Sequence, residues 1–194
     1  MRVIAGSARS LLLKTPAGMT TRPTTDRIKE TLFNILQSEV PGAVLIDLCA
    51  GSGQIGIEAL SRGAGKVYFI DNDNSAVKCI EENLKHTGFV NKSLVLKQDA
   101  VTALAYSIRE RADVIFADPP YGKGTDEQIL AAAAKSRAVD TDTLIIIEEA
   151  IERDFSFANE LGFDIIREKS YKTNKHVFLK KGSPDEKSDL SGKL

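Results

Sequence analysis

The stretch Val44–Gly56 reads V-L-I-D-L-C-A-G-S-G-Q-I-G, and the rest of the chain is arranged around it. A short apolar run over 44–48 precedes three glycines with the spacing G-x-G-x-x-G, and the helix-forming residues I-E-A-L come directly after them. A strand, a glycine turn and a helix in this order are typical of nucleotide-binding α/β units. The glycines let the backbone turn tightly, and the free N–H groups at the helix start suit an anionic group of a ligand.

An acid near the end of this strand helps to choose the ligand. Asp47 stands four residues before the first glycine. A nicotinamide cofactor brings its pyrophosphate to such a turn, where a carboxylate is unfavourable, whereas the ammonium of a methionine moiety suits a carboxylate. The pattern D-x-x-x-G-x-G therefore favours S-adenosylmethionine (SAM), and a structural turn with Asp47 as a local cap is the alternative. The residues expected to bind the cofactor here are Asp47, Ala50, Gly51, Ser52 and Gly53.

The composition is that of one globular domain. The chain has 194 residues, of which 42% are hydrophobic and 27% are charged. No apolar run approaches the roughly 18 residues of a membrane span, and the N-terminus lacks the apolar segment of a signal peptide. Cys49 and Cys79 match no metal spacing, and we expect His86 to cap a helix end and His176 to lie on a strand surface. We therefore expect a monomeric cytoplasmic protein with reduced core thiols and no metal.

Alternation of apolar strands with helical segments predicts a Rossmann-like α/β fold of the class I SAM-dependent methyltransferases. We expect a seven-stranded, mostly parallel sheet that ends in an antiparallel C-terminal hairpin, with a small β-hairpin and a helix as an N-terminal extension. The expected division is an N-terminal arm and helix over 1–40, a methyltransferase domain over 41–181 and a disordered polar tail over 182–194. Strands are expected at 44–48, 67–70, 94–96, 114–117, 144–147, 163–169 and 175–179, and helices at 26–38, 54–62, 74–86, 101–111, 125–138 and 154–161.

Acids follow the second and third predicted strands, at the sheet edge where open α/β folds bind their ligands. Asp71 closes the second strand 20 residues after the first glycine, so it could accept both hydroxyls of an adenosine ribose, with Asn72 beside it. Asp73 competes for the same role. Asp99 follows the third strand, where its carboxylate could accept from the adenine amino group and the backbone of Ala100 could reach the ring. Each acid could instead be a helix cap.

The fourth strand runs directly into D-P-P-Y at 118–121, which suits the methylation of an amino group on a base. The lone pair of such an amine is delocalised into the ring, and two acceptors that bind its two hydrogens could turn that lone pair toward a methyl group. The acceptors would be the Asp118 carboxylate and the Pro119 carbonyl, and proline stiffens this backbone. Tyr121 offers a stacking face for a flipped base. The expected catalytic residues are Asp118, Pro119, Pro120 and Tyr121, of which Asp118 would also contact the cofactor.

Basic residues gather at both ends of the chain, although the net charge is −1. Residues 1–25 hold four basic residues and no acid, and residues 167–181 hold six basic residues and one acid. These ends could form a surface that faces an anion, with Lys172 and Lys175 in contact with RNA, or two solvated faces.

With these motifs in view, the chain resembles the bacterial RsmD-type methyltransferases, which methylate the exocyclic N2 of one guanine in 16S ribosomal RNA of the small subunit. The resemblance covers nearly the whole chain. Its most specific parts are R-V-I-A-G at 2–6, T-R-P-T-T-D-R-I-K-E-T-L-F-N-I-L at 21–36, D-L-C-A-G-S-G-Q-I-G-I-E-A-L-S-R-G-A at 47–64 and D-P-P-Y at 118–121.

The resemblance implies a role for each motif residue. The N-terminal helix entry would lie over the cofactor or substrate and touch the RNA. The family usually has more glycine and arginine where this chain has residues 7–13, and commonly has phenylalanine where it has Cys49. By resemblance, Asp47 and the glycine turn hold the methionine part, Asp71 the ribose, Asp99 the adenine, Asp118 to Tyr121 the guanine, and Arg22, Thr24 and Arg27 contact the RNA.

Three other functions stay open at this point. An amino-methyltransferase of the same fold could act on adenine N6 in DNA or RNA, or on a protein glutamine, although such relatives commonly carry a larger recognition domain. A nicotinamide-dependent oxidoreductase or nucleotide-binding module would bind NAD and not SAM. A catalytically silent RNA-binding protein would show an affinity that falls steeply with salt.

Overall fold

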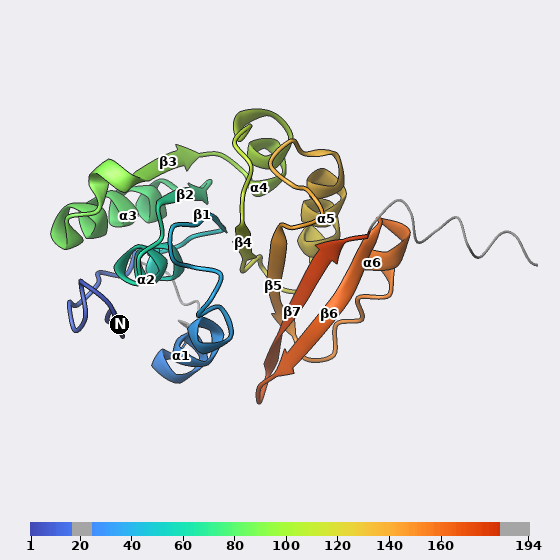
Figure 1. Cartoon of the computed structure of the whole chain (residues 1–194), viewed down its shortest axis with the longest axis horizontal. Helices are drawn as coiled ribbons and strands as arrows, with labels where there is room; N and C mark the ends of the chain where they lie inside the picture. The colour runs from blue at the N-terminus through green and yellow to red at the C-terminus, as the bar shows by residue number, and fades with distance from the viewer. Residues whose placement is uncertain (17–24, 183–194) are drawn as a thin grey trace, which may run out of the picture.

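Seven strands form one sheet in the part of the chain that the structure describes, residues 1–16 and 25–182. In this computed structural model the strand order is 3-2-1-4-5-7-6, and the seventh strand is antiparallel to both neighbours while the other pairs are parallel (Figure 1). The expected Rossmann-like class is confirmed. The strands are β1 (Val44–Leu48), β2 (Lys66–Asp71), β3 (Ser93–Lys97), β4 (Val114–Ala117), β5 (Leu144–Ala150), β6 (Phe163–Ser170) and β7 (Asn174–Lys181).

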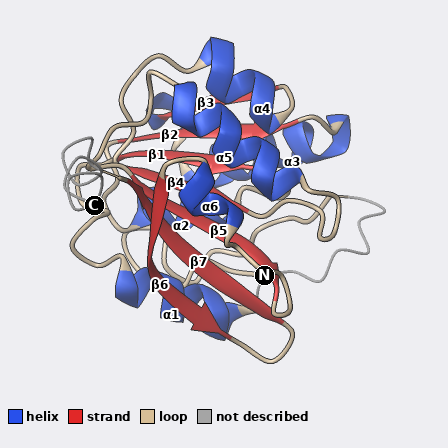
Figure 2. Cartoon of the chain, turned by 90° about the vertical axis from the view of Figure 1, so that its right-hand side faces the viewer, coloured by secondary structure: helices blue, strands red, loops and turns tan. Residues whose placement is uncertain are grey.

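Helices cover both faces of this sheet (Figure 2). The helices on one face come from the N-terminal half of the chain, and those on the other face come after β3. None of the described helices is both long and apolar enough to cross a membrane. The helical segments are α1 (Asp26–Ile35), α2 (Gln54–Ser61), α3 (Asn74–Thr87), η1 (Val90–Lys92), α4 (Ala100–Thr102), η2 (Ala103–Ser107), α5 (Thr125–Lys135) and α6 (Phe157–Glu160).

The helix expected at 101–111 is wrong in extent. The chain forms only the short α4 and then the π-helical turn η2, where the N–H of Ile108 bonds to the carbonyl of Ala103 at 3.0 Å. The backbone becomes extended at Ile108, whose side chain is buried. The polar residues 109–111 that follow offer no apolar face to continue the helix, so the chain leads directly into β4.

Side-chain hydrogen bonds explain two other differences at helix ends. The α5 helix ends earlier than expected because the chain turns at Ser136, whose hydroxyl bonds to a buried carbonyl of η2. The α6 helix starts later because Asp154 accepts from both the N–H and the hydroxyl of Ser156, which forms a turn before the helix. The α3 helix is capped by Asp73, whose carboxylate accepts from two N–H groups of the first turn.

Two apolar clusters lie on opposite faces of the sheet and hold the helices to it. One cluster joins Leu45 and Phe116 to α1, α2 and α3, and the other joins Ile115 and Ile147 to η2, α5 and α6. Successive residues of β4 therefore point into different clusters, as in a strand that is covered on both faces. Each fully buried Leu, Ile or Phe side chain contributes roughly 1.5–3 kcal/mol relative to an exposed one.

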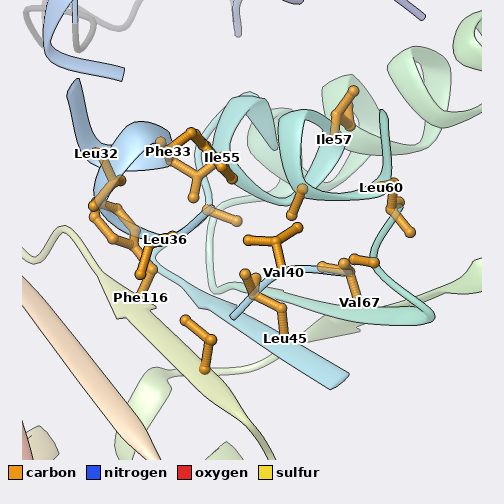
Figure 3. Packing of buried hydrophobic residues seen from close by; sticks show 14 of the residues in the cluster. Leu32, Phe33, Leu36, Val40, Leu45, Ile55, Ile57, Leu60, Val67 and Phe116 are labelled. Atoms are coloured by element: carbon orange, nitrogen blue, oxygen red, sulfur yellow. The ribbon is translucent and has the colours of Figure 1, made fainter. Parts of the chain in front are cut away.

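The α1 helix shares its core with the sheet. Leu32 and Phe33 are 0% exposed, and Leu36, directly after the helix, is 1% exposed. Figure 3 shows these side chains beside Ile55 of α2 and Phe116 of β4. Residues of α1 therefore pack on the face of the sheet that α2 covers, directly after the glycine turn.

A buried charge network fixes the N-terminal arm to α1 and α2. The Glu58 carboxylate of α2 accepts from the N–H groups of Ile4 and Ala5 at 2.7 and 3.0 Å. The Lys29 ammonium of α1 bonds to the carbonyl of Arg2 at 2.6 Å and lies 3.6 Å from Glu58, and both side chains are 0% exposed. Burial lowers the pKa of Lys29, against the opposing effect of Glu58.

The expected surface position of His176 is wrong, because its side chain is 0% exposed. The strand β7 lies between β5 and β6, so neighbours cover it on both sides. Both cysteines are free thiols; Cys79 is buried, as expected, and Cys49 is partly exposed. An antiparallel bridge between Arg2 and Leu12 gives the arm a hairpin-like pairing. The tail predicted to be disordered lies, from residue 183 on, outside the described residues.

Candidate active site

A cavity of about 1030 Å³ opens at the carboxyl ends of the parallel strands. Four loops of the sheet reach it, after β1, β2, β3 and β4, and the turn between β6 and β7 closes another side. Such an edge is where open α/β sheets bind ligands. Of the predicted site residues, the cavity wall brings together Ala50, Gly51, Ser52, Asp71, Asn72, Asp99, Ala100, Asp118, Pro119, Pro120, Tyr121 and Lys172.

The glycine turn is built as the spacing requires. Gly51 and Gly53 have φ values of +56° and +76°, which side chains other than glycine rarely adopt. Gly56 serves packing, because a Cβ there would lie 2.3 Å from the Phe69 ring. Cys49 also has a positive φ of 58°, so the turn begins before its first glycine. The backbone therefore enters the cavity wall in a constrained conformation.

Asp47 and Gly53 do not line this cavity in the described part of the chain. Asp47 is 2% exposed and lies behind the turn, where its carboxylate accepts from the N–H of Gly56 at 2.9 Å. Burial raises the pKa of Asp47 to about 8, and the nearby charge of Asp71 adds to this effect against the Gly56 hydrogen bond. Asp47 therefore supports the turn, and it would attract a cationic ligand only where the charge of that ligand lowers its pKa and ionises it.

Asp71 and Asp73 take different roles. The Asp71 carboxylate lines the cavity and accepts from the N–H of Gly51 at 2.8 Å and of Asp73 at 2.9 Å, so it ties the β1 loop to the β2 loop. Each of its oxygens keeps a second lone pair for a ligand. Asp73 also lines the cavity, but its carboxylate caps α3, and the hydrogen bonds from Ser75 and Ala76 lower its pKa. The geometry thus favours Asp71 over Asp73 as the ligand-facing acid.

Asp99 is both a cap and a part of the cavity wall. Its carboxylate accepts from the N–H of Thr102 at 2.9 Å, and this hydrogen bond lowers its pKa. Asp99 also lines the cavity beside Ala100 and Gln98. The cap and the ligand contact predicted from the sequence are therefore compatible at this position.

Asp118 follows β4 as a half-buried residue whose carboxyl group is not hydrogen-bonded by any described residue, and it faces the cavity. Burial raises its pKa well above the usual range, and the charges of Glu148, Asp47 and Glu149 add to the effect. Pro119 is buried beside it, whereas Tyr121 is 43% exposed on the cavity wall. An acceptor without a donor therefore stands next to an aromatic ring.

A buried polar cluster behind Tyr121 was missed by sequence reasoning. Glu148 of β5 is 5% exposed and lines the cavity. Its Oε1 accepts from the hydroxyl of Tyr121 at 3.0 Å and from Nδ2 of Asn174 at 2.5 Å, and its Oε2 lies 2.9 Å from Nε2 of His176. The sequence signal was an acid at the carboxyl end of the fifth strand, but its partners come from a distant strand, β7.

Gln54, at the start of α2, was also missed. Its Oε1 atom is buried without a hydrogen-bond partner among the described residues, and the residue lines the cavity. A buried acceptor without a donor is costly unless a ligand satisfies it. Gln54 therefore keeps an unsatisfied, buried acceptor beside the glycine turn, in a residue that lines the cavity.

The residues expected to contact RNA fall in different places. Arg22 and Thr24 lie outside the described residues. Arg27 is exposed on α1 and is not among the cavity residues, whereas Lys172 is exposed and lines the cavity. The expectation for Lys175 is corrected: it is 7% exposed, and its ammonium bonds to Glu168 at 3.1 Å. Among residues 1–16 and 25–182, His, Cys, Asp and Glu form no group that could hold a metal ion.

Together, the sheet order and the D-P-P-Y cavity beside a glycine turn define a Rossmann-like class I methyltransferase. A family model described as Conserved hypothetical protein 95 matches residues 1–180. The chain belongs to this family, that of the RsmD-type methyltransferases.

Similar proteins cover nearly the whole chain or most of it. The protein YlbH of Bacillus subtilis is 35% identical over 94% of this chain and 100% of its own length. Ribosomal RNA small subunit methyltransferase D of Escherichia coli is 33% identical over 78% of this chain and 76% of its own. The solved structure of yhhF from Escherichia coli is 28% identical with a TM-score of 0.80, and covers 94% of this chain and 98% of that one.

Proposed function

We propose that the chain is a SAM-dependent methyltransferase that modifies the exocyclic N2 amino group of a guanine in 16S ribosomal RNA. Relatives named Ribosomal RNA small subunit methyltransferase D support an rRNA substrate. The N2 position is supported by the family resemblance, and the chemistry of residues 118–121 supports an exocyclic amino group as the acceptor. The proposal includes a monomer that acts in the cytoplasm on the small subunit or on its assembly intermediate.

The polar groups of the cavity wall fit SAM. When bound, SAM would supply a methyl group activated on a positively charged sulfur. The buried Oε1 of Gln54 would accept from the methionine ammonium. Asp71 would use its remaining lone pairs for the ribose hydroxyls, and Asp99 would accept from the adenine amino group. The residues proposed to hold the cofactor are Gln54, Ala50, Gly51, Ser52, Asp71, Asn72, Asp99 and Ala100, with Asp47 and Gly53 as support behind them. Asp118 lines the same cavity and would face the methyl group without contributing much to the affinity for SAM.

The observation that carries the proposal is the Asp118 carboxyl group, which no described residue satisfies, in the same cavity as the glycine turn. A positive charge brought into this cavity lowers the pKa of Asp118, which leaves an ionised acceptor. Asp118 and the Pro119 carbonyl would bind the two amino hydrogens and orient the nitrogen lone pair. Tyr121, tethered by Glu148, would stack on the base. Catalysis is then mostly positioning, with the released proton passing to solvent.

The direct test is methyl transfer from labelled SAM to small ribosomal subunits that lack the modification, followed by nucleoside analysis of the rRNA. The proposal predicts label in N2-methylguanosine from a single site. Label in another nucleoside, or in protein, would show that the acceptor is wrong. Calorimetric titration with SAM and with NAD in parallel separates a methyltransferase from a nicotinamide-dependent protein, because only SAM should bind.

Two competing functions give different results in the methyl-transfer assay. Methylation of naked DNA at adenine N6 but not of ribosomal subunits would favour an amino-methyltransferase with a different acceptor. RNA binding that weakens steeply with salt and yields no methylated product would favour a silent RNA-binding protein.

A further inference from the structure

We propose that Glu148 selects guanine, by accepting a hydrogen bond from the base N1–H while Asp118 and Pro119 hold the N2 amino group. This inference rests on the proposed function and adds a specificity-determining residue to it. Glu148 would not contact the methyl group that is transferred.

The sheet register places the two carboxylates side by side. Ala117 of β4 pairs with Ile147 of β5, so Asp118 and Glu148 are the next residues of two neighbouring parallel strands. Figure 2 shows these strands adjacent at the centre of the sheet. Both side chains line the same cavity, and the charge of Glu148 is the largest cause, after burial, of the raised pKa of Asp118. A base held by Asp118 would therefore present its neighbouring ring atom to Glu148.

Three donors hold the Glu148 carboxylate and leave one position free. An ionised carboxylate offers about four acceptor positions. Tyr121 and Asn174 occupy the two positions on Oε1, and His176 bonds to Oε2. Because an ionised carboxylate only accepts, Nε2 of His176 is the donor. One acceptor position on Oε2 remains in a group that is 5% exposed and lines the cavity.

The same contacts keep this group an acceptor. Burial by itself would raise the pKa of Glu148, but hydrogen bonds from His176, Tyr121 and Asn174 outweigh it, and the pKa is lowered. The second ring nitrogen of His176 lies 3.3 Å from the hydroxyl of Tyr171, so the ring is held from both sides. Glu148 therefore presents a fixed, ionised acceptor to the cavity.

Guanine matches this wall, and bases with an acceptor at N1 do not. Guanine carries N1–H directly beside its N2 amino group, so one edge offers donors to both carboxylates. In 2-aminopurine the N2 amino group is kept, but N1 is an acceptor that would face the Glu148 carboxylate. A site built to bind a hydrogen-bond donor rejects an analogue that lacks it by about 10⁴-fold in favourable cases, because its buried group is left unpaired.

The test compares guanine with 2-aminopurine at the target position of reconstituted small subunits. We expect wild-type protein to methylate the guanine particle at least about 100-fold faster in kcat/KM. Glu148→Gln, whose amide can donate to N1, should lower this ratio at least tenfold through slower guanine and faster 2-aminopurine methylation. The matched control is Glu149→Gln, which changes the neighbouring acid. Glu149 is not among the described residues that line the cavity, so this variant should keep the wild-type ratio.

The outcomes are distinct. A wild-type protein that does not methylate the guanine particle contradicts the proposed function, and the inference falls with it. Equal wild-type rates on guanine and 2-aminopurine overturn the inference alone, and this comparison needs no variant, so it stands even where Glu148→Gln fails to fold. An unchanged ratio in a folded Glu148→Gln protein that binds SAM as wild type also overturns it, because a purely structural Glu148 would slow both substrates alike.

Discussion

At the scale of single residues, Asp47 is a carboxyl group buried behind the glycine turn, an environment that disfavours its charged form. It is 2% exposed, and among the described residues its carboxylate accepts a single hydrogen bond, from Gly56. Burial raises its pKa to about 8, so the native state holds a proton that the unfolded chain releases near pH 4. Keeping an acid here therefore lowers stability at neutral pH, as is common for groups retained for function.

The raised pKa of Asp47 predicts the effect of Asp47→Asn on stability. Because the folded pKa is raised, the native state of the wild type loses stability as pH rises from about 4 to about 8. Asparagine keeps an acceptor for Gly56 without the charge, so the variant should be more stable by up to about 5 kcal/mol at pH 8 and close to wild type at pH 4. Urea unfolding at both pH values measures this. SAM binding should weaken, and a stability difference that does not change with pH would contradict the account.

At the scale of elements, the buried pair Lys29–Glu58 joins α1, α2 and the N-terminal arm. Glu58 has further donors in the backbone of the arm and in Arg62 at 2.8 Å, whereas Lys29 has only Glu58 as an acid within 4.0 Å among the described residues. A buried charge that loses its partner costs several kcal/mol. The pair is therefore asymmetric: the lysine depends on the glutamate more than the reverse.

The asymmetry predicts unequal costs for the two halves of the pair. Glu58→Gln leaves the Lys29 ammonium buried without a counter-charge and should cost about 3–5 kcal/mol of unfolding free energy, whereas Lys29→Met should cost less. The double variant should cost less than the sum of the single variants, because the residues share a network. Urea denaturation of the four proteins gives the coupling. A Lys29→Met variant that is less stable than Glu58→Gln would contradict the argument.

At the scale of the whole molecule, the features that could be predicted from the sequence are those that depend on neighbouring residues in the chain. The seven strands follow from apolar runs, and the Gly51 turn and the D-P-P-Y segment lie where strand ends meet. The sequence did not predict features that depend on β7 entering between β5 and β6, which are the buried positions of Lys175 and His176 and the contacts of Glu148. Pairing between distant strands determines these contacts, and the residues themselves carry no periodic signal for them.

Lys172 on the cavity wall and the buried Lys175 test this difference between local and distant contacts. Lys172→Ala removes an exposed cation from the cavity wall, so it should raise KM for the RNA substrate about three- to tenfold. It should also reduce the slope of log binding constant against log salt concentration by about one. Lys175→Ala should leave the salt dependence unchanged and lower stability, because its ammonium is buried against Glu168. Filter binding at several salt concentrations, with urea unfolding, separates the two effects. Equal salt slopes in wild type and Lys172→Ala would show that Lys172 does not contact the RNA.

The central claim is that Asp118 orients the amino group that receives the methyl group. Single-turnover methylation of unmodified small subunits by Asp118→Ala, with Asp164→Ala on an exposed strand as control, tests this most directly. We predict a rate at least about 100-fold below wild type with the dissociation constant for SAM within about threefold, and a control that matches wild type. Methyl transfer by Asp118→Ala at the wild-type rate would contradict the account.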